Sequence, residues 1–341
     1  MSKETTLSSS TVDDISQGIS GVDISDNIDI CRPCTDSITT EICANCGKEG
    51  GSLKSCAACK LVKYCSRDCQ IAHRAQHKKG CRRRAAELRE EEVKRAAELH
   101  DEKLFKQPPS LYGDCPICFL QIPAFYLGSR YKSCCGKDIC SGCIHAMQQL
   151  DGGIGLCPFC RTPTPESDKV IERLHKRVET NDPRAIFILG NHYSEGSHGL
   201  AQDHTKALEL YHRAAELDNT QSYHNIGNAY FHGNGVEMNE KKAMHYWELS
   251  AMGGASPARH NLGALEQKRG NIDRAVKHYM IAVGGGDNLS LKTFHALYSN
   301  GKVTKEKYAK ALRAYQQYVG EVKSDQRDAA AAFYGRYKYI E

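Results

Sequence analysis

The feature that most constrains the fold is a run of paired metal-binding residues between positions 43 and 81. Seven cysteines and one histidine fall there in four pairs, which are Cys43 with Cys46, Cys56 with Cys59, Cys65 with Cys69, and His77 with Cys81. Two ligands spaced in this way can bind one tetrahedral zinc ion, at a Zn–S distance of about 2.3 Å. Four pairs make two complete sites, and such closed sites are structural because they leave no open position for a substrate.

The same stretch has too few apolar residues to build a hydrophobic core. Leu53, Leu61, Val62, Tyr64 and Ile71 are nearly all that it contains. Metal binding must therefore supply most of the folding free energy, which is about 10–16 kcal/mol per structural zinc ion at neutral pH.

The ligand spacing, together with the sequences YCSRDCQ and HKKGC, resembles the MYND-type zinc finger over the whole of residues 43–81. Spacing alone does not separate an interleaved pairing of the ligands from a sequential one. The resemblance implies the interleaved pairing, with one zinc ion on Cys43, Cys46, Cys65 and Cys69 and a second on Cys56, Cys59, His77 and Cys81. MYND fingers usually carry a tryptophan that helps to bind proline-rich peptides, and Arg74 stands in its place here.

A helix is expected over residues 67–78, with Ser66 as its N-cap. Cys69, His73 and His77 would then share one face, because residues four apart are neighbours on a helix. His73 is accordingly the alternative to His77 as a zinc ligand.

A second group of cysteines lies between positions 115 and 160. It comprises Cys115 with Cys118, Cys134 with Cys135, Cys140 with Cys143, and Cys157 with Cys160. The order and spacing resemble a RING finger, in which the first and third pairs share one zinc ion and the second and fourth pairs share another. The resemblance implies a site at Cys115, Cys118, Cys140 and Cys143.

The other RING-like site departs from the family pattern, because Lys137 stands where RING fingers have a ligand histidine. Cys157 and Cys160 therefore need two further ligands. Cys134 with Cys135 is the first choice, and Cys135 with His145 is the second. In the third alternative the module binds one zinc ion, and Cys134 is a small buried apolar side chain. With both sites complete, the chain would bind about four zinc ions.

RING fingers that act as ubiquitin ligases bind a ubiquitin-conjugating enzyme in an apolar groove. The resemblance implies three partner-binding residues, which are Ile117 inside the first pair, Pro158 after the seventh ligand and Arg161 after the last cysteine. A cation at Arg161 can stabilise the ubiquitin-loaded state, and Met147 or Leu150 could complete the groove. In the alternative interpretation, Ile117 and Pro158 only pack the zinc loops and Arg161 is solvated.

Two segments of biased composition flank the first finger. Residues 1–42 are rich in Ser, Thr and Asp and lack aromatic residues, which predicts a disordered acidic tail. Cys31 and Cys34 in that tail are interpreted as free thiols rather than as a metal site. Residues 82–110 interleave charges with strong helix formers, which predicts an exposed helical linker ending near Pro108 and Pro109.

Residues 167–341 contain no cysteine and repeat themselves. Ala207, Ala243, Ala275 and Ala311 recur at spacings of 36, 32 and 36, and four residues after each stands Tyr211, Trp247, Tyr279 or Tyr315. This period indicates an α-solenoid with two helices per unit. The sequence LGNHYSEG…DHTKALELYHRAAE resembles the Sel-one-like repeat, a relative of the tetratricopeptide repeat. Arrays of this kind bind peptides or proteins on a concave face.

Glycines mark the first helix of three units, at Gly190, Gly227 and Gly263, and His295 takes the corresponding place in the fourth. Glycine inside a helix costs about 1 kcal/mol relative to alanine. We therefore expect the paired helix to approach closely at these positions. Asp182 followed by Pro183 predicts the start of the first repeat helix.

Composition excludes several classes of protein. The 17 cysteines are odd in number and occur largely as C-x-x-C pairs, and no secretory signal opens the chain, so a disulfide framework is not expected. Reduced thiols that bind zinc are expected in the cytoplasm and/or the nucleus. No apolar run approaches ~18 residues, so no membrane span is predicted.

The formal net charge of +5 counts every cysteine as neutral. Zinc-bound cysteines are thiolates, and fifteen of them with four Zn²⁺ ions lower the net charge by seven, to about −2. Nucleic acid is therefore not an expected partner.

The sequence thus predicts a multidomain protein in which two zinc-stabilised cross-brace modules precede an all-α solenoid. The expected parts are a disordered tail (1–42), a MYND-type finger (43–81), a charged helical linker (82–110), a RING-type finger (115–165) and Sel-one-like repeats (167–341). No catalytic residues are assigned. The first functional hypothesis is a ubiquitin ligase in which the repeats select the client and the RING-type finger recruits the conjugating enzyme. The alternative is a non-catalytic scaffold, favoured by Lys137 and Arg74 at departures from the family patterns.

Overall fold

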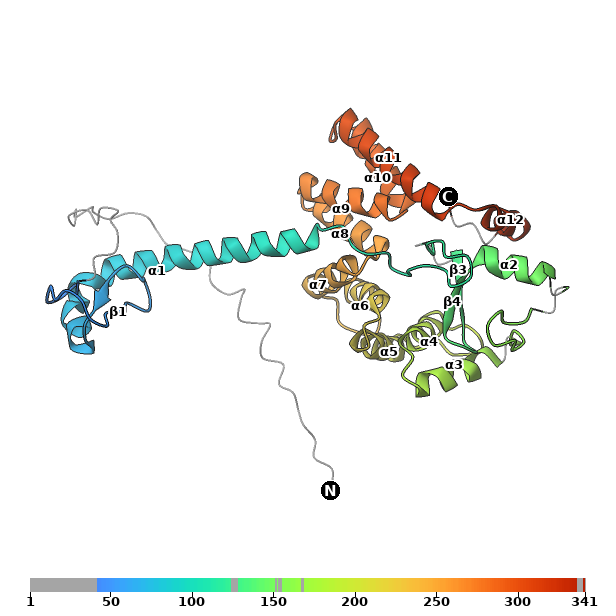
Figure 1. Ribbon diagram of the computed structural model, residues 1–341, viewed down its shortest axis with the longest axis horizontal. Helices are drawn as coiled ribbons and strands as arrows, with labels where there is room; N and C mark the ends of the chain where they lie inside the picture. The colour runs from blue at the N-terminus through green and yellow to red at the C-terminus, as the bar shows by residue number, and fades with distance from the viewer. Residues whose placement is uncertain are drawn as a thin grey trace, which may run out of the picture. The chain divides into compact units, whose positions relative to one another are not determined.

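The computed structural model of the chain describes residues 42–123, 128–150, 152, 155–166, 169–335 and 340 (Figure 1). The chain divides into two compact units, Met1–Glu91 and Glu92–Glu341. The predicted disordered tail, with Cys31 and Cys34, lies outside the described residues.

The first unit contains a small hairpin followed by the start of a long helix. Strand β1 (Lys54–Ser55) pairs antiparallel with β2 (Lys63–Tyr64), and helix α1 begins at Arg67. The Ser66 hydroxyl accepts a hydrogen bond from the backbone N–H of Cys69 at 3.2 Å, which confirms the predicted N-cap.

Helix α1 (Arg67–Leu104) continues through the expected end of the finger helix and through the linker without a break. The segment after the finger contains strong helix formers and no proline, so nothing in it stops the helix. Arg84 adds contacts along the surface, since its guanidinium lies 3.1 Å from carboxylate oxygens of both Glu87 and Glu91. Residues 91–100 are exposed, as expected for a charged linker.

The last turn of α1 differs from the expected exposed linker because it packs within the second unit. Leu104 is fully buried, and the Phe105 ring lies 4.7 Å from the ring of His278. The Asp101 carboxylate pairs with Arg274 at 2.5 Å. The fully buried Leu104 and the partly buried Phe105 explain the difference, because these two large apolar side chains follow a highly charged stretch.

The second cysteine module, residues 115–165, is built on one hairpin and one helix. Strand β3 (Ser129–Lys132) pairs antiparallel with β4 (Lys137–Cys140), which leads directly into α2 (Ser141–Leu150). Ile122, Ile139 and Ile144 are buried with the cysteine side chains. This apolar core is small, as in the first finger.

Ten further helices follow in the described part of the chain. They are α3 (Lys169–Glu179), α4 (Pro183–Glu195), α5 (His204–Glu216), α6 (Thr220–His232), α7 (Glu240–Met252), α8 (Ser256–Lys268), α9 (Ile272–Gly284), α10 (Asn288–Ser299), α11 (Lys305–Val322) and α12 (Asp325–Phe333). Helices α4 to α11 form four consecutive pairs, which is the solenoid that the sequence predicted. The short loop 269–271 between α8 and α9 accounts for the shorter spacing of the third unit.

The glycines of the first helices face the aromatic residues of their partners, as expected. A Cβ atom added at Gly190, Gly227 or Gly263 would lie 2.7 Å from Tyr211, 2.4 Å from Trp247 or 2.7 Å from Tyr279, respectively. Real Cβ atoms do not approach other atoms so closely, so a larger residue would force the helices apart. Asp182 accepts hydrogen bonds from the backbone N–H groups of Arg184 and Ala185, which confirms the predicted helix start.

Candidate metal centres

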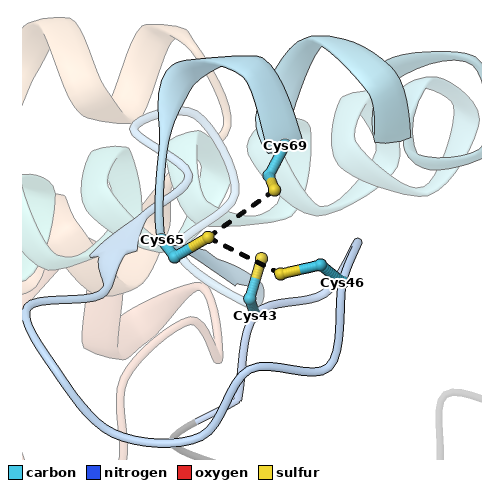
Figure 2. A group of neighbouring side chains, drawn as sticks. All are labelled: Cys43, Cys46, Cys65 and Cys69. Carbon is cyan, nitrogen blue, oxygen red and sulfur yellow. Dashed lines mark hydrogen bonds between the residues drawn. The ribbon is translucent and has the colours of Figure 1, made fainter.

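The first centre joins three parts of the first unit. Cys43 and Cys46 lie in the loop before β1, Cys65 follows β2, and Cys69 lies in the first turn of α1. Their four Sγ atoms lie within 4.8 Å of one another and point toward a common centre (Figure 2).

The second centre uses the next turns of α1. His77 and Cys81 are four residues apart on the helix, and they face Cys56 and Cys59 from the hairpin region. The Nε2 atom of His77 lies 3.3 Å from Cys59 Sγ. His73 is not part of this group, because its Nδ1 atom is hydrogen-bonded to the Tyr64 hydroxyl at 3.0 Å.

The spacing of the sulfur atoms agrees with tetrahedral zinc. A tetrahedron with Zn–S bonds of about 2.3 Å has edges of about 3.8 Å. The Sγ–Sγ distances are 3.6 Å for Cys46–Cys65 and 3.7 Å for Cys56–Cys81. These short contacts are therefore the edges of coordination shells rather than thiol hydrogen bonds.

The third centre groups Cys115, Cys118, Cys140 and Cys143. The Sγ–Sγ distances are 3.9 Å for Cys115–Cys143 and 3.7 Å for Cys118–Cys140. Backbone N–H groups point at the sulfur atoms, with the N–H of Cys140 at 3.5 Å from Cys115 Sγ. Such donors stabilise thiolate ligands.

The fourth centre groups Cys134, Cys135, Cys157 and Cys160. The Sγ atoms of Cys135 and Cys157 are 3.6 Å apart. His145 lies elsewhere, since it is buried on α2 with its ring 5.1 Å from that of Phe333.

The unusual Cys-Cys pair has a structural explanation. The Gly136 N–H donates to the Lys132 carbonyl at 2.8 Å, and Gly136 has a φ of 71°. This turn has the shape of the C-x-x-C turns, but Lys132 stands where they have their first cysteine. Cys134 lies in the middle of the turn and places its sulfur in the cluster instead.

Apart from Cys140–Cys143, where the chain enters α2, the C-x-x-C pairs of the described residues share one backbone turn, which the sequence analysis missed. In each, the residue after the second cysteine donates its N–H to the carbonyl of the first cysteine, at 2.8 to 2.9 Å. That residue has a positive φ, of 69° at Gly47, 57° at Lys60, 57° at Phe119 and 58° at Arg161. The tight turn presents both sulfur atoms to one side. In the sequence, only the position directly after the second cysteine could have marked this turn, because three of the four residues there are not glycine.

The electrostatics of the clusters favour a bound dication. Backbone N–H groups of Cys46 and Cys65 lower the pKa of the Cys43 thiol to about 6. In the third centre, however, hydrogen bonding of the Cys143 thiol to the sulfur atoms of Cys115 and Cys140 raises the pKa of Cys143, and burial and repulsion between thiolates raise it further. Four thiols can therefore ionise together only with a cation between them, and the donor sets fit Zn²⁺.

Helix α12 supports the third centre from outside its ligands, and Figure 1 shows it beside α2. Arg327 is fully buried, and its guanidinium donates to the carbonyls of Gln121 at 2.9 Å and Leu120 at 3.3 Å. These two residues follow directly after the Cys115–Phe119 turn. Gly142 allows the approach, because an added Cβ atom would lie 2.8 Å from the Arg327 backbone nitrogen.

The three residues expected to bind a partner differ in their exposure to solvent. Ile117 and Pro158 are half-buried, and Ile117 packs against the core around Ile139. Arg161 is exposed. Sequence reasoning missed Phe119, which is 78% exposed at the end of the first turn, although its place beside a ligand could have marked it.

A family model of the MYND finger matches residues 43–81. Residues 43–81 are a MYND finger. Models of the Sel1 repeat match residues 183–219 and 220–254, which hold the helix pairs α4–α5 and α6–α7.

One curated relative and two solved structures are similar to parts of the chain. Over 114 residues the chain is 30% identical to the "ERAD-associated E3 ubiquitin-protein ligase component HRD3B" of Arabidopsis thaliana. The matched segment covers 33% of this chain and only 18% of that protein. A Sel1 repeat protein from Oxalobacter formigenes is 22% identical, with a TM-score of 0.40, over 58% of this chain and 80% of that one. The protective antigen c5321 of uropathogenic Escherichia coli, which displays an SLR fold, is 25% identical, with a TM-score of 0.38, over 50% and 37% of the two chains.

The two family-model matches and the clusters together indicate the general role of the protein. The MYND finger and the other cysteine clusters fit zinc, and a zinc-finger region followed by Sel1 repeats has a protein-interaction role. In the part of the chain that the structure describes, no helix has the length and apolar character needed to cross a membrane.

Proposed function

We propose that this protein is a RING-type ubiquitin ligase in which residues 115–165 recruit a ubiquitin-conjugating enzyme and the Sel1 repeats select the client. The observation that carries the proposal is the interleaving of the third and fourth centres. The first cysteine pair shares a cluster with the third pair, and the second shares one with the fourth. This cross-brace is the arrangement implied by the resemblance to RING fingers.

The proposed zinc ligands are the members of the four clusters. They are Cys43, Cys46, Cys65 and Cys69; Cys56, Cys59, His77 and Cys81; Cys115, Cys118, Cys140 and Cys143; and Cys134, Cys135, Cys157 and Cys160. The zinc ions hold the loops in place and take no part in ubiquitin transfer. None of these cysteines is in a disulfide, which supports a reducing compartment such as the cytoplasm or the nucleus.

Exposed apolar side chains support recruitment of a partner by residues 115–165. Phe119 and Leu150 are 78% and 80% exposed, and Phe159 lies between the ligands Cys157 and Cys160. Exposed aromatic residues are enriched at protein interfaces because they bury a large apolar area on binding. Together with half-buried Ile117, they are proposed as the apolar contacts for a conjugating enzyme.

Arg161 is proposed to act after recruitment. It follows the last cysteine, it is exposed, and the positive φ of its turn fixes the direction in which the side chain leaves the backbone. A guanidinium can hydrogen-bond two partners at once. Arg161 would therefore stabilise the ubiquitin-loaded enzyme in the conformation that transfers ubiquitin.

The relative from Arabidopsis supports an association with ubiquitin ligation, because its name makes it a component of a ubiquitin ligase. That relative is similar over 33% of this chain. The similarity therefore supports an association with ubiquitin ligation, whereas the proposed ligase activity is supported by the cross-brace geometry.

The proposal is tested by discharge of ubiquitin from loaded conjugating enzymes in the presence of the purified chain. Ile117→Ala should weaken recruitment, because it removes apolar contact area worth roughly 25 cal/mol per Å². Arg161→Gly should leave recruitment unchanged and slow transfer. Glycine is the suitable replacement, since it accepts the φ of 58° at this position without strain.

The matched control for the second variant is Lys60→Gly, at the equivalent position of a MYND turn with a φ of 57°. It should not affect discharge. Wild-type rates in both Ile117→Ala and Arg161→Gly would show that this surface is not the one used.

The second candidate function is a non-catalytic scaffold, and one observation favours it. Lys137 begins β4, and its ammonium group lies 5.4 Å from the centre of the Phe159 ring. The lysine thus covers part of the proposed groove with a cation–π contact. A wild-type protein that discharges none of a broad panel of loaded enzymes would support the scaffold.

A further inference from the structure

A large cleft in the second unit separates the second cysteine module from the first repeat helices. Its volume is about 960 Å³. One wall is β3, a second wall is the segment 162–165, and the remaining walls are α3 and α4. Binding pockets typically measure about 300–1,000 Å³, so the cleft is large enough for a short peptide.

The wall formed by β3 is a strand edge. Six consecutive residues, 129–134, line the cleft, and the last of them is Cys134 of the fourth centre, whose Cys157 lines it as well. Neighbouring side chains of a strand point to opposite faces, so a cavity that touches all of them lies along the backbone edge. Among the described residues β3 pairs only with β4, so its second edge has no strand partner among them. The edge facing the cleft therefore offers backbone groups to another strand.

The opposite walls are apolar. Val170 and Leu174 come from α3, and Ile188 comes from α4. The segment 162–165 contributes Pro163 and Pro165. Proline has no backbone N–H to donate, so this wall competes little for the hydrogen bonds of an added strand.

The charged side chains on the walls of the cleft are predominantly cationic. Lys132 and Arg173 line it, with Arg130, whereas Glu195 is the acidic residue among the lining residues. Arg173 is held at the rim, because its guanidinium donates to the Pro163 carbonyl at 2.8 Å. Burial lowers the pKa of His192, which also lines the cleft, to about 4, so this histidine is neutral at pH 7.

We propose that the cleft binds an extended, acidic peptide segment of a client protein by addition of a strand to the free edge of β3. The peptide backbone would pair with residues 129–132, and alternate apolar side chains would pack on Val170 and Ile188. The intervening acidic side chains would meet Lys132 and Arg173. The inference rests on the client-selecting part of the proposed function and adds the site and the class of client segment.

Fluorescence anisotropy with the full zinc-loaded chain tests the charge requirement. The probe is a labelled peptide of about seven residues that alternates valine with aspartate, and its matched control has lysine in place of aspartate. The acidic peptide should bind at least about tenfold more tightly. Lys132→Glu with Arg173→Glu should weaken its binding by about tenfold or more. The control variant, Lys310→Glu with Arg313→Glu, makes the same charge change on exposed residues of α11 and should bind normally.

Two further measurements test the site and the strand geometry. Ile188→Trp narrows the cleft without a charge change and should also weaken binding. In a strand addition only alternate N–H groups of the peptide face β3. Two peptides are therefore compared, one N-methylated at the odd positions and one at the even positions. Methylation of the N–H groups that face β3 should abolish binding, whereas methylation of the other set should leave binding intact.

Equal binding of the acidic and basic peptides, or equal effects of the two sets of methylation, would overturn the proposal. The outcome is independent of ligase activity, which the discharge assay measures separately. Peptide binding without ubiquitin discharge would identify a scaffold that uses this cleft. Ubiquitin discharge without peptide binding would show that the peptide-binding proposal is wrong and leave the proposed ligase function in place.

Discussion

Arg327 in α12 donates a hydrogen bond of 2.9 Å to the backbone carbonyl of Gln121, more than two hundred residues earlier in the chain. The same nitrogen donates to the Val322 carbonyl at 2.6 Å. A buried guanidinium thus ties the end of the repeat region to the loop that follows the first ligands of the third centre. Zinc binding and packing of the C-terminal helices are therefore coupled.

Arg327→Leu should destabilise the second unit. It leaves the carbonyls of Gln121 and Val322 without a donor, at a cost of about 1–3 kcal/mol each. Urea unfolding should show a fall of about 2–5 kcal/mol in the free energy of unfolding, and zinc transfer to a chromogenic chelator should be faster. Arg313→Leu, on an exposed face of α11, should change the free energy by less than about 0.5 kcal/mol. Equal effects of the two variants would show that Arg327 has no special role.

Gly227→Ala should destabilise the repeats, although alanine is the better helix former. The added Cβ atom would lie 2.4 Å from Trp247 Cδ1, and overpacking of this kind costs about 1–3 kcal/mol. Gly320→Ala in α11 is the matched control, because no atom lies within 4 Å of its added Cβ. It should raise the melting temperature slightly, through helix propensity. A melting temperature raised by both changes would contradict close packing at Gly227.

The solenoid could be predicted because its signals are local and repeated. Gly227 and Trp247 mark one helix pair, and the same pattern recurs in the neighbouring units. The members of the four clusters could also be foreseen, from the spacing of the cysteines together with the resemblance to known fingers. The support from Arg327 could not, because nothing in the sequence near α12 indicates a contact with residues 120–121. Cys134 with Cys135 was the first choice for the fourth centre, but the spacing did not show that Cys134 takes the place of a cysteine missing at Lys132, because this depends on the backbone of one turn.

The stability of the second unit should fall as the pH is lowered below about 6.5. Burial, with Arg259 and Arg274 nearby, lowers the pKa of His278 to about 3 from its ordinary value of 6.5. Between pH 6.5 and pH 3 the unfolded chain therefore binds a proton at His278 that the folded chain does not bind. The contribution of neutral His278 to the free energy of unfolding is complete above pH 6.5 and is lost as the pH falls toward 3. His278→Phe should flatten the decline of melting temperature with acidification, whereas exposed His245→Gln should not. An unchanged slope in His278→Phe would contradict the assignment.

Chelation should loosen the two ends of α1 to different extents. Cys69, His77 and Cys81 fix its first turns to the MYND finger, and residues 91–100 have no cover. Removal of zinc should therefore increase amide hydrogen exchange over residues 67–90. Helices α6 to α9 contain no ligand and should retain their protection. Full loss of protection in α6 to α9 would show that the repeats depend on zinc for folding.

We propose that the chain holds four closed zinc centres, two of them in a cross-brace at residues 115–160. Elemental analysis of the purified protein measures the number of these centres. The wild-type chain should contain about four zinc ions and the double variant Cys134→Ser with Cys135→Ser about three, because each closed site binds one ion. About three zinc ions in both proteins would remove the fourth centre, and iron in place of zinc would contradict the account as a whole.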